Sequence, residues 1–183
     1  MATKKHTLET LLDSYRSGFS LDQQFYTDVG IFEQEWEYIW KKYWLFAGTT
    51  AEIPKAGDFF TYQLGKDSVI IIRGNGGEVY AHHNTCRHRG SLICLEASGH
   101  AAKLVCPYHQ WVYDKDGSLL KARLMPEGFD TSSYGLHPVQ VRVANGFIFV
   151  SLSDNPPDFS RFSRRLTIAA APSDHRPIPQ RPW

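Results

Sequence analysis

Two cysteine–histidine pairs constrain the fold of this chain more than any other feature of its sequence. Cys86 and His88 form a C-x-H pair, and Cys106 and His109 form a C-x-x-H pair. Each pair follows a short apolar run, so each is expected on a loop at the end of a β-strand. A disulfide framework, a zinc site, an iron–sulfur site and coincidence are the alternatives that such pairs leave open.

Composition weighs against the disulfide and against two classes of partner. The chain has only three cysteines, and its polar N-terminus, MATKKHTLETLLDSYRSG, has no apolar core of the signal-peptide type. We therefore expect a cytoplasmic protein with reduced thiols. The net charge is +1, from 20 basic and 19 acidic side chains, so we expect no nucleic-acid partner. No apolar run approaches the ~20 residues that span a bilayer, so we expect no membrane partner.

The ligand types within each pair favour an iron–sulfur cluster. Structural zinc sites usually take like ligands from each loop, as in C-x2-4-C and H-x3-5-H. Here each loop offers one sulfur and one nitrogen, so two facing loops could place both thiolates on one iron and both imidazoles on a second. That is the ligand set of a Rieske [2Fe–2S] centre. We favour this centre over zinc or chance, with Cys86, His88, Cys106 and His109 as the metal ligands.

Residues 1–50 are predicted to form an N-terminal helical arm. A short amphipathic face is formed by Leu8, Leu11, Leu12 and Tyr15. Asp28 can cap a longer helix, because apolar side chains follow it at helical spacing, namely Phe32, Trp36, Ile39, Trp40 and Tyr43. We expect this aromatic stripe to be a packing surface.

Residues 51–158 change to short β-branched and aromatic runs, which predict strands at 59–64, 68–73, 78–83, 103–106, 111–114, 139–143 and 146–152. Turn sequences separate them, GNGG (74–77), DKDG (114–117) and ANG (144–146). Short strands without intervening helices indicate an antiparallel sandwich or barrel. The fold class is therefore mainly β with an N-terminal helical arm. Residues 159–183 are rich in Arg and Pro and contain no Lys, so we expect an irregular tail.

A family resemblance rests on CRHRG (86–90) and CPYHQW (106–111), which resemble the two cluster loops of Rieske non-haem iron oxygenases. It extends over about residues 20–159, from EWEYIWKKYWLFAG to GLHPVQVRVANGFIFVSLSDNPPDF. It implies a Rieske-type antiparallel β-sandwich with the four ligands above. The segments FSLDQQFYTD and AEIPKAGDFF look most like enzymes that demethylate quaternary ammonium compounds, such as glycine betaine or stachydrine.

The resemblance also implies partners and a further domain. Electrons would come from a flavin- and iron–sulfur-containing, NAD(P)H-dependent reductase, and the full-length subunits of the family form homo-oligomers. A mononuclear Fe(II) on a two-histidine, one-carboxylate triad would lie in a C-terminal catalytic domain. Only 24 residues follow Phe159, so we expect this chain to lack that domain and to end in a tail read out of frame.

Two functions compete on this sequence. The first is electron transfer as the Rieske portion of an oxygenase that hydroxylates or N-demethylates a small aromatic or quaternary ammonium substrate. The second is a stand-alone Rieske ferredoxin, and a zinc-stabilised binding module is a third alternative. The fifty-residue arm favours the oxygenase, because ferredoxins of this kind begin almost directly with the sheet.

Four neighbours of the ligands have expected roles of their own. His82 and His83 are expected to be structural, Trp111 to cover the cluster as a core aromatic, and Cys94 to be a free thiol. Arg87 and Arg89 either donate hydrogen bonds near the cluster or form a solvated basic loop.

Overall fold

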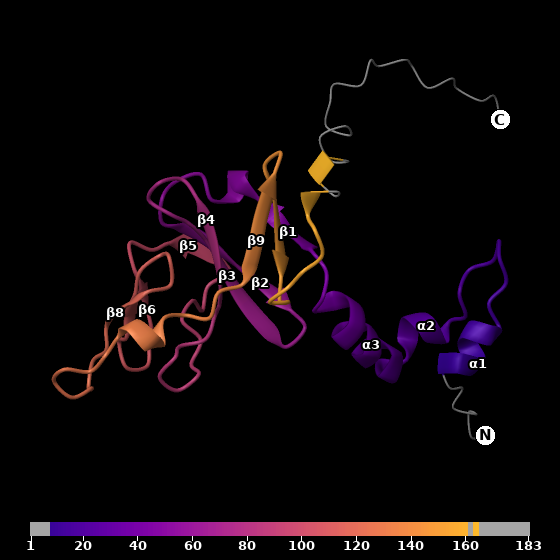
Figure 1. Ribbon diagram of the computed structural model, residues 1–183, viewed down its shortest axis with the longest axis horizontal. Coiled ribbons are helices and arrows are strands. Elements are labelled where there is room, and N and C mark those ends of the chain that lie inside the picture. Colours follow the sequence, from indigo (N-terminus) through magenta and orange to yellow (C-terminus); the bar gives the residue numbers. More distant parts are fainter. Residues whose placement is uncertain (1–7, 161–162, 165–183) are drawn as a thin grey trace, which may run out of the picture.

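The computed structural model describes residues 8–160 and 163–164 (Figure 1). The predicted tail at 159–183 therefore lies almost entirely outside the described residues. The helices are α1 (Leu8–Asp13), α2 (Gln24–Thr27) and α3 (Val29–Glu35), and a π-helical turn follows at Trp36–Trp40. The strands are β1 (Leu45–Thr49), β2 (Asp58–Leu64), β3 (Asp67–Arg73), β4 (Val79–His83), β5 (Ser98–His100), β6 (Leu104–Val105), β7 (Val112–Tyr113), β8 (Leu119–Lys121), β9 (Gln140–Ala144) and β10 (Phe147–Ser151).

The strands form three antiparallel sheets, which confirms the predicted mainly-β class. The first sheet has the order β1–β10–β9, the second β4–β3–β2–β5, and the third, a small sheet, β6–β7–β8. A single bridge between His82 and Pro138 joins the edge of the second sheet to the segment that enters β9. Figure 1 shows the small sheet at the end of the molecule that lies farthest from the helices.

Strand β3 is the centre of the fold because both of its faces are buried. Its sequence SVIIIR has no alternation, and all four residues from Val69 to Ile72 are fully buried. Such an unbroken apolar run is typical of a strand that is covered on both sides. Burying each of these side chains stabilises the fold by about 1.5–3 kcal/mol.

Two hydrophobic cores lie on the two faces of β3. The first, here called the outer core, packs the second sheet against the first and contains Ile53, Phe60, Val69, Ile71, Ala81, Val139, Ile148 and Val150. The other, here called the site core, packs the second sheet against the small sheet and contains Phe59, Ile70, Ile72, Cys86, Ile93, Leu104, Cys106, Trp111, Tyr113, Leu119 and Leu136. Two of the predicted ligands are thus core residues.

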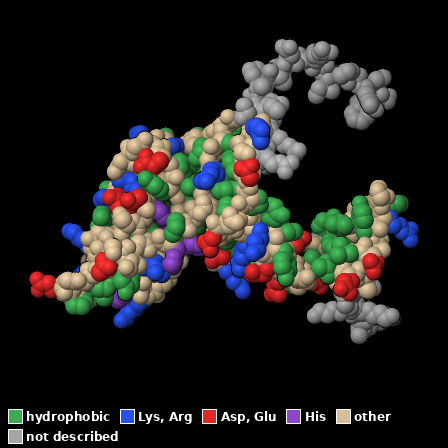
Figure 2. Space-filling model, viewed as in Figure 1, with side chains coloured by type: hydrophobic (Ala, Val, Ile, Leu, Met, Phe, Trp, Pro, Cys, Tyr) green, Lys and Arg blue, Asp and Glu red, His purple; other side chains and the backbone are tan. Residues whose placement is uncertain are grey.

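The helical arm is shorter than the sequence predicts. Helical structure ends at Trp40, and Leu45–Thr49 is a strand instead of the predicted helix because it pairs with β10. The predicted cap is confirmed, since the Ile31 N–H donates to Asp28 Oδ1 at 3.1 Å. The aromatic stripe is packed only in part within the described chain, because Trp36 lies against Gly65 in the β2–β3 turn while the rest of the stripe is exposed. Phe32 is 52% exposed, and Figure 2 shows hydrophobic side chains along the arm.

Three strands escaped the prediction, for physical reasons that differ. Strand β1 contains Gly48 at a break in its register with β10, and this break hides its pattern. Strand β5, Ser98–His100, has no apolar side chain and exists because it pairs with β2. Strand β8 is only three residues long. No helix in the described part of the chain is long and apolar enough to cross a membrane.

His82 is buried between β4 and the turn at Gly117, as expected for a structural residue. Its Nε2–H donates to the Lys115 carbonyl at 2.8 Å, while Nδ1 has no hydrogen-bond partner. A Cβ at Gly117 would lie only 2.7 Å from His82 Cε1, so the turn needs glycine both for this close approach and for its φ of +89°. Burial lowers the pKa of His82, so the ring stays neutral in the folded protein.

Replacing His82 by Gln tests this burial through the pH dependence of stability. Glutamine keeps an N–H for the Lys115 carbonyl but cannot take up a proton. Below the ordinary His82 pKa of 6.5 the unfolded chain binds a proton that the folded chain does not, so stability is lost as the pH falls. Urea denaturation should show a steeper loss between about pH 7 and about pH 5 in the wild type than in His82→Gln. Parallel pH profiles would contradict a neutral buried His82.

Candidate metal centre

The two predicted ligand loops adopt the same closed turn. In the first loop the Cys86 N–H donates to the Ser91 carbonyl at 2.8 Å, and the Gly90 N–H donates back to the Cys86 carbonyl at 2.9 Å. In the second, the Cys106 N–H donates to the Trp111 carbonyl at 2.9 Å, and the Gln110 N–H donates to the Cys106 carbonyl at 3.0 Å. Each cysteine therefore begins a six-residue turn that its own backbone closes.

The sulfur ends of both loops are buried. Cys86 is 3% exposed and Cys106 is 1% exposed, and both belong to the site core. Burial, and then contact with Cys106, raise the pKa of the Cys86 thiol. All three cysteines are free thiols, so the disulfide alternative is wrong and the expectation for Cys94 is confirmed. Burial raises the pKa of Cys94 to about 11.

Tyr113 touches the first of these sulfurs. Its hydroxyl lies 3.3 Å from Cys86 Sγ and accepts a hydrogen bond from the Arg87 N–H at 3.0 Å. Because the hydroxyl oxygen already accepts from the backbone, its own hydrogen is free to point toward the sulfur. No sequence pattern singles out Tyr113, although it stands two residues after Trp111 in the WVYD run.

The nitrogen ends of the loops meet at the edge of the site core. His88 Nδ1 and His109 Nδ1 are 3.1 Å apart, and both side chains are half-buried. Burial, with the charges of His109 and Arg89, lowers the pKa of His88, which favours a neutral imidazole whose nitrogen can bind a metal.

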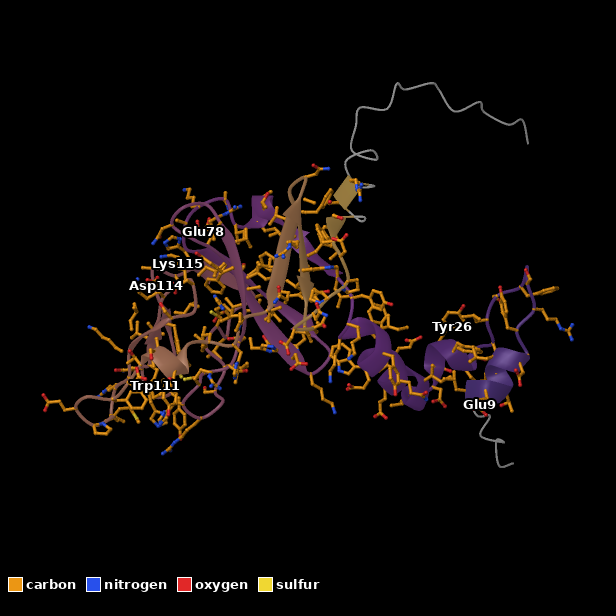
Figure 3. All side chains as sticks on the ribbon, in the orientation of Figure 1. Glu9, Tyr26, Glu78, Trp111, Asp114 and Lys115 are labelled. Carbon is orange, nitrogen blue, oxygen red and sulfur yellow. The ribbon has the colours of Figure 1, made fainter. Side chains whose placement is uncertain are left out.

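An aromatic ring packs against each imidazole. Trp111 stacks on His88 with ring centroids 4.9 Å apart and an interplanar angle of 10°, and Tyr108 lies 3.8 Å from the His109 ring. Trp111 is fully buried, as expected of a core aromatic, and packs in turn on Phe129 and Tyr134. Figure 3 shows Trp111 at the end of the molecule that holds the small sheet.

This donor set fits a cluster of two irons. Two buried thiols and two facing imidazoles form two like pairs, as the Rieske ligand set requires. Within residues 8–160 and 163–164, no three His, Cys, Asp or Glu side chains surround a single point that could hold one ion. The two thiols therefore lie together inside the site core, and the two imidazoles lie together at its edge.

Asn84 fastens the first ligand loop to β3 and is a residue that sequence reasoning missed. Its Oδ1 accepts from the N–H groups of Ile93 and Cys94 at 3.0 and 2.9 Å. Its Nδ2 donates to the Cys94 carbonyl at 2.7 Å and to the Ser68 hydroxyl at 3.1 Å. The side chain is buried, so it closes the segment that carries both ligands of the first loop.

The two arginines of the first loop differ. Arg87 Nη1 lies 2.6 Å from His137 Nε2, so this side chain turns toward the segment that leads into β9. Arg89 is exposed, and its charge helps to lower the pKa of His88. Within the described residues neither arginine side chain hydrogen-bonds to a cysteine sulfur, and the Tyr113 hydroxyl lies against Cys86 Sγ instead.

Substituting Asn84 by Ala should destabilise the described fold by about 2–4 kcal/mol, because two buried N–H groups lose their acceptor. Chemical denaturation measures this loss. Ser68→Ala is the matched control, since it removes only one contact of the same amide, and it should cost less than about 1.5 kcal/mol. Equal losses for the two variants would show that Asn84 does not hold the loop.

Comparison with known proteins agrees with this geometry. A family model described as "Rieske [2Fe-2S] domain" matches residues 43–140. The glycine betaine monooxygenase oxygenase subunit of Pseudomonas aeruginosa is 50% identical over 165 residues, which are 90% of this chain and 38% of that protein.

Two solved structures share the fold. A quaternary ammonium Rieske monooxygenase superposes with a TM-score of 0.71 at 33% identity, over 80% of this chain and 44% of that one. Naphthalene 1,2-dioxygenase from Rhodococcus sp. superposes with a TM-score of 0.78 at 28% identity, over 89% of this chain and 39% of that one. The chain thus spans about two fifths of the length of such proteins. These matches confirm the resemblance to Rieske oxygenases, and the chain belongs to the Rieske [2Fe–2S] domain family.

Proposed function

We propose that this chain transfers electrons through a [2Fe–2S] cluster held by Cys86 and Cys106 on one iron and by His88 and His109 on the other. One observation carries the proposal: two matched turns bring two buried thiols together and place two imidazole nitrogens 3.1 Å apart. A bound cluster of this kind would supply a one-electron carrier.

The side chains around the thiols and those around the imidazoles have different roles in the proposed function. The site core keeps water from the thiols, and Tyr113 offers a hydrogen bond to Cys86. The half-buried imidazoles lie toward solvent, so they are the ends at which an electron enters or leaves.

The chain is proposed to act as the Rieske portion of an oxygenase that demethylates a quaternary ammonium compound. The support is the 50% identity to glycine betaine monooxygenase oxygenase subunits. A solved quaternary ammonium Rieske monooxygenase is described as showing carnitine oxidation and inter-subunit electron transfer. By analogy an NAD(P)H-dependent reductase supplies the electrons, and a mononuclear iron in the further part of a longer, oligomeric protein receives them. Three free thiols fit a reducing cytoplasm.

Loss of a single ligand should abolish the cluster. We expect the purified protein to be red-brown, with two irons and two sulfides per chain and a Rieske-type electron paramagnetic resonance signal in the reduced state. Cys106→Ala and His109→Ala should remove the signal, because a Rieske centre needs two thiolates on one iron and two imidazoles on the other. Cys94→Ala, a thiol outside the ligand pairs, should keep it. Stoichiometric zinc without acid-labile sulfide would overturn the proposal.

The reduction potential should lie near the low end of the Rieske range, about −150 mV. Gln110 and Trp111 follow His109, and neither side chain has a hydroxyl group that could donate a hydrogen bond to a sulfur. Tyr113→Phe should lower the potential further, because a hydrogen bond to a cysteine sulfur stabilises the reduced state. Redox titration followed by electron paramagnetic resonance measures both values. A wild-type potential well above zero, or an unchanged potential in Tyr113→Phe, would contradict this account of the sulfur environment.

A further inference from the structure

An open groove of about 630 Å³ runs beside the second ligand loop. Its apolar floor includes Val105 and Val112, which lie on the neighbouring strands β6 and β7. Its ionisable lining residues, Lys121 and Arg123, are both cations. Gln110 completes the wall, and it directly follows His109, a proposed ligand.

The backbone on both sides of this groove is strained. Gln110 has a φ of +59° and Leu124 a φ of +70°, in the left-handed region that residues other than glycine rarely adopt. The position equivalent to Gln110 in the first loop is Gly90, with a φ of +73°. Strain of this kind persists where the surrounding structure over-determines it, and it clusters at functional sites.

Two hydrogen bonds hold the second ligand loop against Arg123, the residue before Leu124. Arg123 Nη1 donates to Gln110 Oε1, and Trp111 Nε1–H donates to the Arg123 carbonyl at 3.2 Å. The second ligand loop therefore binds both the side chain and the carbonyl of Arg123. The next residue, Leu124, has a side chain that is 73% exposed. Leu124 directly follows Arg123, a lining residue of the groove, so a molecule seated in the groove can reach its exposed side chain.

We propose that this groove, with Leu124 at its edge, is the docking surface for an acidic electron-donor protein that reduces the cluster. The inference rests on the proposed function. Its apolar floor matches the small core of a protein interface, and its cations match a carboxylate-rich rim. A partner seated there lies against Gln110, so it comes within one residue of His109.

The form of the surface fits a brief encounter better than a permanent subunit contact. Permanent interfaces are large and mainly apolar, like a divided core. Here a small floor is edged by Lys121 and Arg123, and such charges act mainly by steering a diffusing partner of opposite charge. We therefore assign the groove to a soluble donor and treat a second copy of this chain as a competing outcome.

The test measures reduction of the 183-residue chain by an acidic plant-type [2Fe–2S] ferredoxin, reduced in advance and mixed in a stopped-flow spectrometer. Plant-type ferredoxins, at about −400 mV, can drive the transfer. The wild-type rate should fall with added salt, and Lys121→Glu should slow it by about tenfold at low salt. Lys66→Glu makes the same charge change on the β2–β3 turn, outside the groove, and should leave the rate unchanged. Photoreduced riboflavin, a small reductant that needs no docking surface, should reduce all three proteins at similar rates.

A second variant separates docking from folding. Leu124→Gly relieves the left-handed strain, so it should melt at or above the wild-type temperature, yet ferredoxin should reduce it severalfold more slowly. A salt-independent wild-type rate, an undiminished rate in Lys121→Glu, or equal slowing by Lys66→Glu would overturn the docking inference. So would a dimer that Lys121→Glu dissociates, since it would assign the groove to a second copy. A protein without cluster signals would instead overturn the proposed function.

Discussion

The burial of β3 on both faces is the constraint on which the rest of this structure depends. One strand separates two cores, so Val69 and Ile71 hold the first sheet while Ile70 and Ile72 hold the small sheet. The thiols of the proposed ligands Cys86 and Cys106 belong to the second of these cores. A shift of β3 by one residue would exchange its two faces and remove the support of the site. The site is therefore part of the packing of the domain and not an addition to its surface.

Local patterns predicted much of this arrangement, and long-range contacts supplied the rest. The apolar runs of β2, β3 and β10 carry their own signal, and so do the cysteine–histidine pairs. Strands β1 and β5 do not, because each exists through pairing with a distant partner. Asn84 and Tyr113 escaped for the same reason, since their roles depend on atoms 10 and 27 residues away in sequence. The exposed stripe of the arm could not be predicted either, because periodicity indicates a face but not what covers it.

The two ends of the site have opposite environments, and the turns that carry them are the same. Each turn starts with a cysteine directed into the core and carries a histidine at the edge, so one backbone design supplies both proposed ligand types. The turns differ in the position of the histidine and in their fifth residue, which is Gly90 in one and Gln110 in the other. The second turn accepts backbone strain and gains a side chain that reaches Arg123.

The small sheet has strands of only two or three residues. Few backbone hydrogen bonds hold it, so its stability depends on the side chains of the site core and on contacts between the two ligand loops. We therefore expect this end of the molecule to form a separate cooperative unit that opens at a lower free energy than the long sheets. A cluster bound by both loops would act as the cross-link of that unit, so that maturation of the protein would end with its metal and not with its chain.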